Sequence, residues 1–159
     1  MKRIFLPILL FSMFLLNGCA SDANFTVSLT WNSGLSSYDS KSGTLIKDCM
    51  ANDPTNFTTA LHLSDAQMDE VRSILGRIDL AEYPTEYDAG AGMAKPPSGV
   101  TLTVTANGGT HRVACRHVGD YTSDDPAGQA FLSVCSDLIT LITSTPEWQS
   151  LPEFETLLQ

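Results

Sequence analysis

Two histidines and a cysteine around residue 115 come close to a metal-ligand set. His111, Cys115 and His117 are even numbers of residues apart, so a β-strand would project all three to one side, where they could bind zinc or copper(I). Cys115 also alternates with Val113, however, and a cysteine in an apolar strand pattern is commonly a small buried hydrophobic residue. We therefore expect no metal site and no cofactor.

The sequence contains none of the short motifs that place a nucleophile, a base or a phosphate-binding loop. It has no G-x-S-x-G elbow, no S-x-x-K or C-x-x-C pair, no H-E-x-x-H helix, no Gly-rich phosphate loop and no EF-hand acid spacing. Active sites can also assemble from residues far apart in the sequence, but no pattern here points to one. We expect a protein that is not an enzyme.

The chain is strongly acidic. Nine Lys and Arg residues stand against eighteen Asp and Glu residues, which gives a formal net charge of −9. Domains that bind nucleic acid carry clustered Lys and Arg, and the sequence has no such cluster. An acidic surface also repels anionic lipid headgroups. We expect no nucleic-acid partner and no basic patch that could attach the protein to a membrane.

Alternating apolar and polar residues predict β-strands in both halves of the chain. Residues 25–31 alternate without a break, and residues 100–105 and 110–118 flank an Asn-Gly dipeptide, which is typical of a tight hairpin. A further hairpin is expected around Gly43, which can adopt a positive φ. Two helices are predicted as well: 65–78, with a capping box from Ser64 and Gln67, and 126–144, behind an acidic cap in Asp124-Asp125.

Each of these elements has one apolar face, so the elements must share one core. Their order predicts an α+β two-layer sandwich, in which an antiparallel sheet of about four strands has two helices packed on one face. Residues 25–159 are expected to form this single domain, with a flexible loop at 85–99 that is rich in Gly and Pro.

The helix-free face of that sheet is the surface on which we expect a partner. Thr101 and Thr103 alternate with the apolar residues of one strand, and Arg112 and Arg116 fall on the same side of the next strand. The face would be flat, polar and locally basic on an acidic protein, which suits docking to another protein by charge complementarity. Ordinary β-propensity on a solvated face is the simpler explanation of the threonines.

The N-terminus combines a charged start, an apolar run over residues 4–16 and the tetrapeptide Leu16-Asn17-Gly18-Cys19. The run is shorter than the ~20 residues of a membrane-spanning helix. The tetrapeptide resembles the lipobox of small bacterial lipoproteins, although Asn17 departs from the usual Ala, Ser or Thr. By this resemblance residues 1–18 are a signal peptide that is cleaved, and residues 19–24 are a lipidated tether.

The resemblance implies acyl chains such as palmitate on Cys19 and residence in the bacterial cell envelope, because two chains suffice for stable anchoring. The residue directly after Cys19 is Ala20 and not aspartate. In a source with two membranes this favours the outer membrane, with the protein facing the periplasm. Disulfides persist in that compartment, and Cys49, Cys115 and Cys135 remain to form one. A Cys115–Cys135 bridge between a strand and a helix is our preferred pairing, with Cys49 bonded to either of them as the alternative.

Three classes of function fit this sequence. We prefer a non-catalytic interaction module, such as an inhibitor or assembly factor, that is anchored to the membrane and binds another envelope protein. The alternatives are a carrier of a small or lipidic ligand, in a cleft between sheet and helices, and an enzyme with a spatially assembled site. An unfilled apolar pocket under the helices would favour the carrier. A filled core with an exposed sheet would favour the module.

Overall fold

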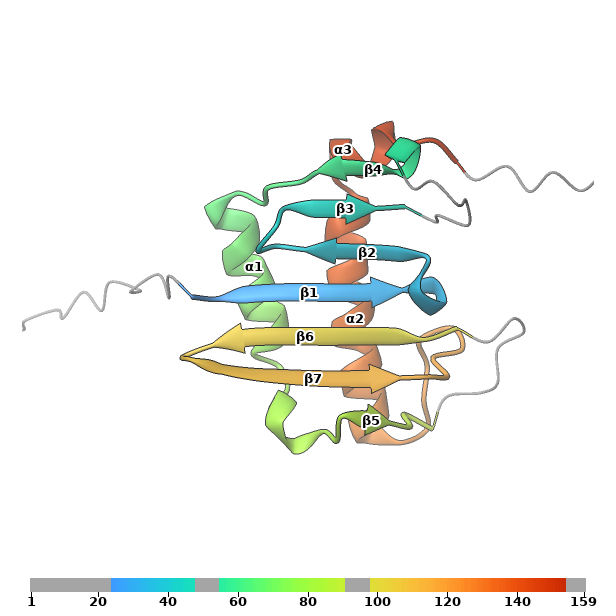
Figure 1. Cartoon of the computed structure of the whole chain (residues 1–159). Coiled ribbons are helices and arrows are strands. Elements are labelled where there is room, and N and C mark those ends of the chain that lie inside the picture. Colours follow the sequence, from blue (N-terminus) through green and yellow to red (C-terminus); the bar gives the residue numbers. More distant parts are fainter. Residues whose placement is uncertain (1–23, 48–54, 91–97, 154–159) are drawn as a thin grey trace, which may run out of the picture.

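A computed structural model describes residues 24–47, 55–90 and 98–153 of the chain. Within them, one β-sheet is covered on a single face by helices (Figure 1). The predicted signal peptide, Cys19 with the first residues of the tether, and Cys49 lie outside the described residues. No helix in the described ranges is long and apolar enough to cross a membrane.

The sheet has seven strands in the order β4-β3-β2-β1-β6-β7-β5. Six of them are joined by antiparallel pairing, and β5 lies parallel to β7 at one edge. The strands are β1 (Thr26–Trp31), β2 (Ser36–Asp39), β3 (Thr44–Ile46), β4 (Thr58–Ala60), β5 (Glu86–Tyr87), β6 (Val100–Ala106) and β7 (Gly109–Cys115).

The α+β class is as predicted, but the predicted antiparallel sheet of about four strands is wrong. The sheet is mixed and has seven strands. Two of the unexpected strands are very short: β4 has three residues, and β5 has two and lies inside the segment 85–99 that we expected to be a flexible loop. Such strands form because a neighbouring strand offers free backbone groups, and they leave no periodic pattern in the sequence.

The predicted hairpin turns are present where the sequence placed them. The Asn107-Gly108 dipeptide between β6 and β7 has φ values of 51° and 76°, which is the geometry of a two-residue type I′ turn. Gly43, in the turn between β2 and β3, has a φ of 66°. Each turn fixes the register of its hairpin and so decides which side chains share a face.

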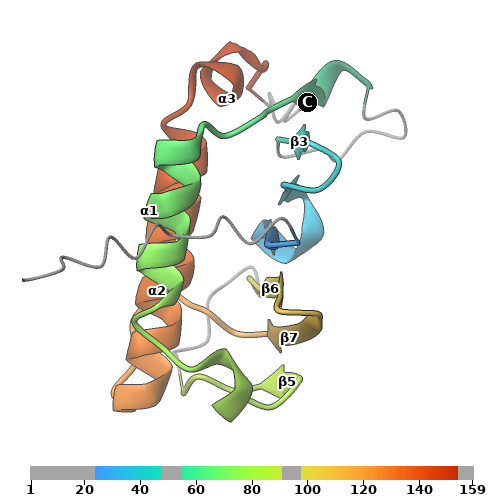
Figure 2. The same cartoon turned by 90° about the vertical axis from the view of Figure 1, so that its left-hand side faces the viewer.

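Two long helices lie on the same side of the sheet, and no helix of the described ranges covers the other side (Figure 2). Helix α1 spans Asp65–Leu75 and has the predicted capping box, with Ser64 and Gln67 bonding each other's backbone N–H groups. It ends three residues before the predicted Ile78. Helix α2 spans Pro126–Thr143, and the carboxylate of its N-cap Asp125 accepts a hydrogen bond from the Gly128 N–H at 2.7 Å. A short helix, α3 (Pro146–Ser150), follows it.

The core fills the space between the sheet and the two long helices. Leu29 and Leu102 from the sheet, and Phe131 and Leu132 from α2, are 0% exposed. At the β4 end of the molecule Trp148 of α3 packs on Trp31 with ring centroids 5.5 Å apart. This close packing leaves the face without helices as the side of the sheet that is open to solvent.

A buried lysine fastens the end of the described chain to the sheet. Lys47 is 3% exposed, and its ammonium group lies 2.6 Å from the Glu153 carboxylate and 3.2 Å from the Leu151 carbonyl oxygen. It also lies 5.2 Å from the centre of the Trp148 ring. A buried ammonium group needs such partners because burial without them costs several kcal/mol, on the order of the whole stability of a small domain.

Candidate functional site

The four residues predicted to form an interaction face share the open face of the sheet. Strand pairing puts Thr103 opposite Arg112, and Thr101 opposite Ala114. On the other side of β6, Thr101 and Thr103 lie opposite Thr30 and Ser28 of β1. The structure therefore brings Thr101, Thr103 and Arg112 together on β6 and β7, and Arg116 follows directly after β7. The open face is the front of the sheet in Figure 1, and Ser28, Thr30, Thr101 and Thr103 give it short hydroxyl side chains.

A hollow interrupts this face where β6 begins and β7 ends. Ala114 lies in the middle of it and offers only a methyl group, with Thr101 and Glu86 as its neighbours across the strands. Arg112 and Arg116 lie two residues before and after Ala114 on the same side. The hollow has a volume of about 420 Å³. We call it the arginine hollow, and its main residues are Thr30, Ser33, Glu86, Thr101, Arg112, Ala114 and Arg116.

The two arginines of the hollow share one glutamate. The Arg116 Nε atom donates a hydrogen bond of 3.1 Å to Oε2 of Glu86, and Arg112 Nη1 is 3.9 Å from Oε1 of the same carboxylate. The arginine hollow thus carries one net positive charge. The whole face is less basic than predicted, because Asp39 of β2 also lies on it, opposite Ser28.

A strained turn borders the arginine hollow. The three residues that follow β1, Asn32, Ser33 and Gly34, all have left-handed backbone angles, with φ values of 50°, 55° and 96°. A side chain in this conformation costs roughly 1–2 kcal/mol per residue. Strained backbone tends to be kept at functional sites, where the surrounding structure compensates for it. Ser33 and Gly34 line the hollow, so the strain and the charged residues belong to one place.

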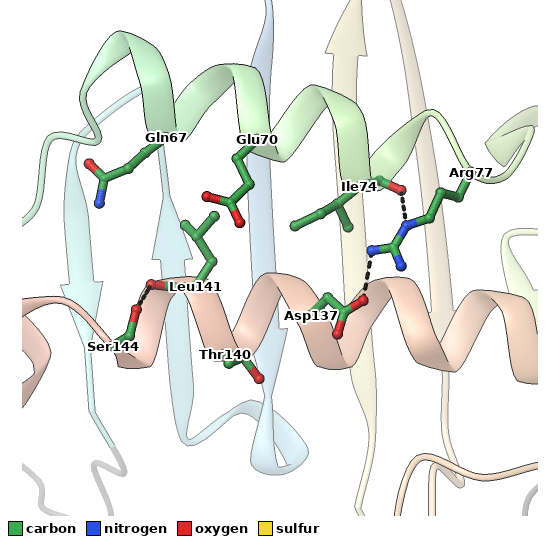
Figure 3. Close-up of a pocket in the computed structure, with 8 residues that line it drawn as sticks. All are labelled: Gln67, Glu70, Ile74, Arg77, Asp137, Thr140, Leu141 and Ser144. Carbon is green, nitrogen blue, oxygen red and sulfur yellow. Dashed lines mark hydrogen bonds and ion pairs between the residues drawn. The ribbon is translucent and has the colours of Figure 1, made fainter.

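A second depression lies in the helix layer, between α1 and α2 (Figure 3). It has a volume of about 410 Å³ and is lined by Gln67, Glu70, Ile74, Arg77, Asp137, Thr140, Leu141 and Ser144. Arg77 is paired with Asp137 at 2.7 Å across the groove, and the Gln67 side chain serves the capping box. Arg77, Asp137 and Gln67 are thus occupied in joining or capping the helices, and Glu70 is exposed to solvent. The arginine hollow is the better candidate site.

The three residues that resembled a metal-ligand set do not form a shared site. His111 is exposed on β7, His117 is exposed beyond the end of that strand, and Cys115 is buried. Burial raises the pKa of the Cys115 thiol, which favours the protonated form, whereas a metal needs the thiolate. In the ranges that the structure describes, no three His, Cys, Asp or Glu residues are grouped so that they could hold a metal ion.

Cys115 and Cys135 both lie in the core as free thiols. Burial is the main cause of the raised pKa of Cys135, and the neighbouring Cys115 raises it further. A thiol that stays protonated at neutral pH is a poor nucleophile, which fits a packing role for both residues. The Cys115–Cys135 disulfide stays a prediction.

Sequence reasoning did not assign Ala114 or Glu86 to the interaction face. Ala114 could have been noticed, because a small residue between Arg112 and Arg116 at strand spacing leaves room between two long side chains. Glu86 gave no signal, since it reaches the hollow only through the pairing of the two-residue strand β5 with β7.

Comparison with known proteins does not place the chain in a family. No protein-family model matches it, and no curated protein sequence matches it either. What the protein does must therefore be argued from its own residues and geometry.

Proposed function

We propose that the protein is a membrane-anchored lipoprotein of the bacterial cell envelope that acts as a non-catalytic interaction module, in the manner of an inhibitor or assembly factor. The observation that carries this proposal is the contrast between the two faces of the sheet. One face packs on the helices with core residues at 0% exposure, and the other is open, polar and hollowed at one end.

This contrast favours the module over the two alternatives. A carrier needs an unfilled apolar space, but side chains such as Phe131 and Leu132 fill the layer between sheet and helices. An enzyme needs accessible groups with suitably shifted pKa values. Among the described residues, the largest shifts are those of Tyr121 and Cys135, whose pKa values are raised chiefly by burial. Neither group suits proton transfer near neutral pH.

The anchor is proposed from the N-terminal tetrapeptide ending at Cys19. The segment before it holds two of the nine basic residues and none of the acidic ones, so the remaining chain is even more acidic than the whole. A domain with this negative charge has no electrostatic attraction to anionic lipid headgroups. Attachment through acyl chains on Cys19 is the route that fits, to the outer membrane on its periplasmic side in a source with two membranes.

Replacing Cys19 with serine is expected to abolish lipidation without unfolding the domain. Cell fractionation should find a soluble domain or an uncleaved precursor held by its signal peptide, and metabolic labelling with palmitate should find no lipid on the variant. Cys49→Ser is the matched control, which should keep its lipid. A mature, unlipidated Cys19→Ser protein that stays in the membrane fraction would contradict the acyl anchor.

The interaction face can be tested in cells with a photoreactive amino acid at single positions. Thr103, at the middle of the open face, is the test position, and Ser73, exposed on α1, is the control on the helix layer. We expect a discrete cross-linked product with an envelope protein from position 103 and none from position 73. Equal products from both positions, or none from position 103, would contradict docking through the open face.

A further inference from the structure

The arginine hollow contains more hydrogen-bond donors than its own chain uses. An arginine side chain offers five N–H donors. In the described part of the chain, Glu86 takes one hydrogen bond from Arg116, and its contact with Arg112 is 3.9 Å long, beyond hydrogen-bond distance. The side chains of Arg112 and Arg116 are 48% and 78% exposed. Donors of both guanidinium groups are therefore open to a further acceptor.

We propose that the arginine hollow binds a side-chain carboxylate from an extended acidic segment of the partner, and that Glu86 competes with it from within. This inference rests on the proposed docking function and names the chemistry of the partner. Glu86 stays within the hollow even when it leaves Arg116, so the net charge there stays +1. This charge matches the single charge of a carboxylate better than the higher charge of a phosphate. The hydroxyl groups of Thr30 and Thr101 at the rim can donate to the second carboxylate oxygen or to the peptide.

Glu86 occupies the place that the partner's carboxylate would take beside Arg116. Its side chain is 56% exposed and comes from the edge strand β5, which has only two residues. A short edge strand yields more easily than an interior one, so an incoming carboxylate can displace Glu86 from the shared arginines. The acidic remainder of the protein opposes anions at long range, so binding is expected to depend on direct contact with the hollow.

The probe for this site is an N-acetylated, C-amidated peptide of three glutamates. It would be titrated into the folded protein while the Nε–H signals of the arginine side chains are followed by NMR. In the wild type, the signals of Arg112 and Arg116 should shift, and those of Arg72 and Arg77 should not, because these two are paired within the helix layer. Inorganic phosphate at the same concentration should shift the first pair less than the peptide does.

Two substitutions then separate a built site from a general attraction. Glu86→Gln removes the internal competitor and should tighten peptide binding about two- to fivefold, the range expected for an exposed ion pair. Ala114→Leu fills the hollow and should weaken binding at least about fivefold, if the loss is that of one exposed charge-assisted contact. Glu86→Gln leaves all packing in place, so it stays informative even if Ala114→Leu alters the fold.

Unchanged affinity in Glu86→Gln, equal shifts at all four arginines, or stronger shifts with phosphate would each overturn the carboxylate site. The results also distinguish refutation of the carboxylate site from refutation of the docking function. If cross-linking from position 103 succeeds while Glu86→Gln leaves the affinity for the peptide unchanged, the carboxylate site is refuted and docking through the open face stands. If the peptide binds as expected while position 103 gives no product, the hollow stands and the docking proposal fails.

Discussion

Replacing Phe131 with alanine is expected to lower the free energy of unfolding by about 3–5 kcal/mol, the usual cost of truncating a buried phenylalanine. Phe131 is 0% exposed in the middle of the core. Its ring lies 5.3 Å from that of Tyr83 and 5.5 Å from that of Tyr87, centre to centre. The truncation thus loses both buried apolar surface and two aromatic contacts. Urea denaturation followed by circular dichroism measures the change.

Two further variants make the Phe131 experiment interpretable. Phe131→Leu keeps most of the volume and should cost less than about 1.5 kcal/mol. Phe25→Ala removes a ring that is only partly buried and lies over Arg72 at 4.7 Å, so its effect should be clearly smaller than that of Phe131→Ala. Equal costs for Phe25→Ala and Phe131→Ala would show that the core is not centred where the structure places it. Because Tyr87 belongs to β5, Phe131→Ala should also loosen Glu86 in the arginine hollow.

Gly128→Ala is expected to destabilise the protein by about 1–3 kcal/mol, the cost of overpacking. Glycine to alanine within a helix usually has the opposite sign and stabilises by about 0.4–1 kcal/mol. The reversal follows from the position of Gly128 in the first turn of α2. A Cβ atom there would collide with the backbone carbonyl oxygen of Ala89 and would lie 2.7 Å from the Ser123 hydroxyl.

Gly76→Ala is the matched control for this reversal. Gly76 follows α1 with a φ of −65°, which alanine adopts without strain, and an added Cβ would lie 3.3 Å from the Arg72 carbonyl oxygen. We expect its unfolding free energy to change by less than about 1 kcal/mol. Thermal and urea unfolding of both variants would check the difference. A stabilising Gly128→Ala would show that α2 does not approach Ala89 as closely as described.

Local sequence signals predicted the elements that are stabilised locally. The capping box of Ser64 and Gln67, the N-cap Asp125 and the Asn107-Gly108 turn each involve groups within a few residues of one another, and the structure has all three. The side assigned to Thr101, Thr103 and Arg112 followed from strand alternation alone. These features need no knowledge of the rest of the fold.

The features that could not be predicted depend on pairing across the sheet. Strand β5 exists because the backbone of Glu86 and Tyr87 meets that of Ala114 and Cys115, almost thirty residues later in the chain. Its two residues have no periodicity, and they lie next to a Gly- and Pro-rich run that favours a loop. The ion pairs of Glu86 and the arginine hollow could not be predicted either, because both depend on the register of this pairing.

The chain enters the sheet through its central strand, and this has a mechanical consequence. Strand β1 begins at Thr26 and is bonded on both sides, to β2 and to β6. The hydrogen bonds of antiparallel pairs run perpendicular to the strands. A pull on the N-terminal residues, while a partner holds the open face, therefore loads both ladders of β1 in shear, so many bonds share the force. The same pull on an edge strand would load only one ladder, so fewer bonds would share the force.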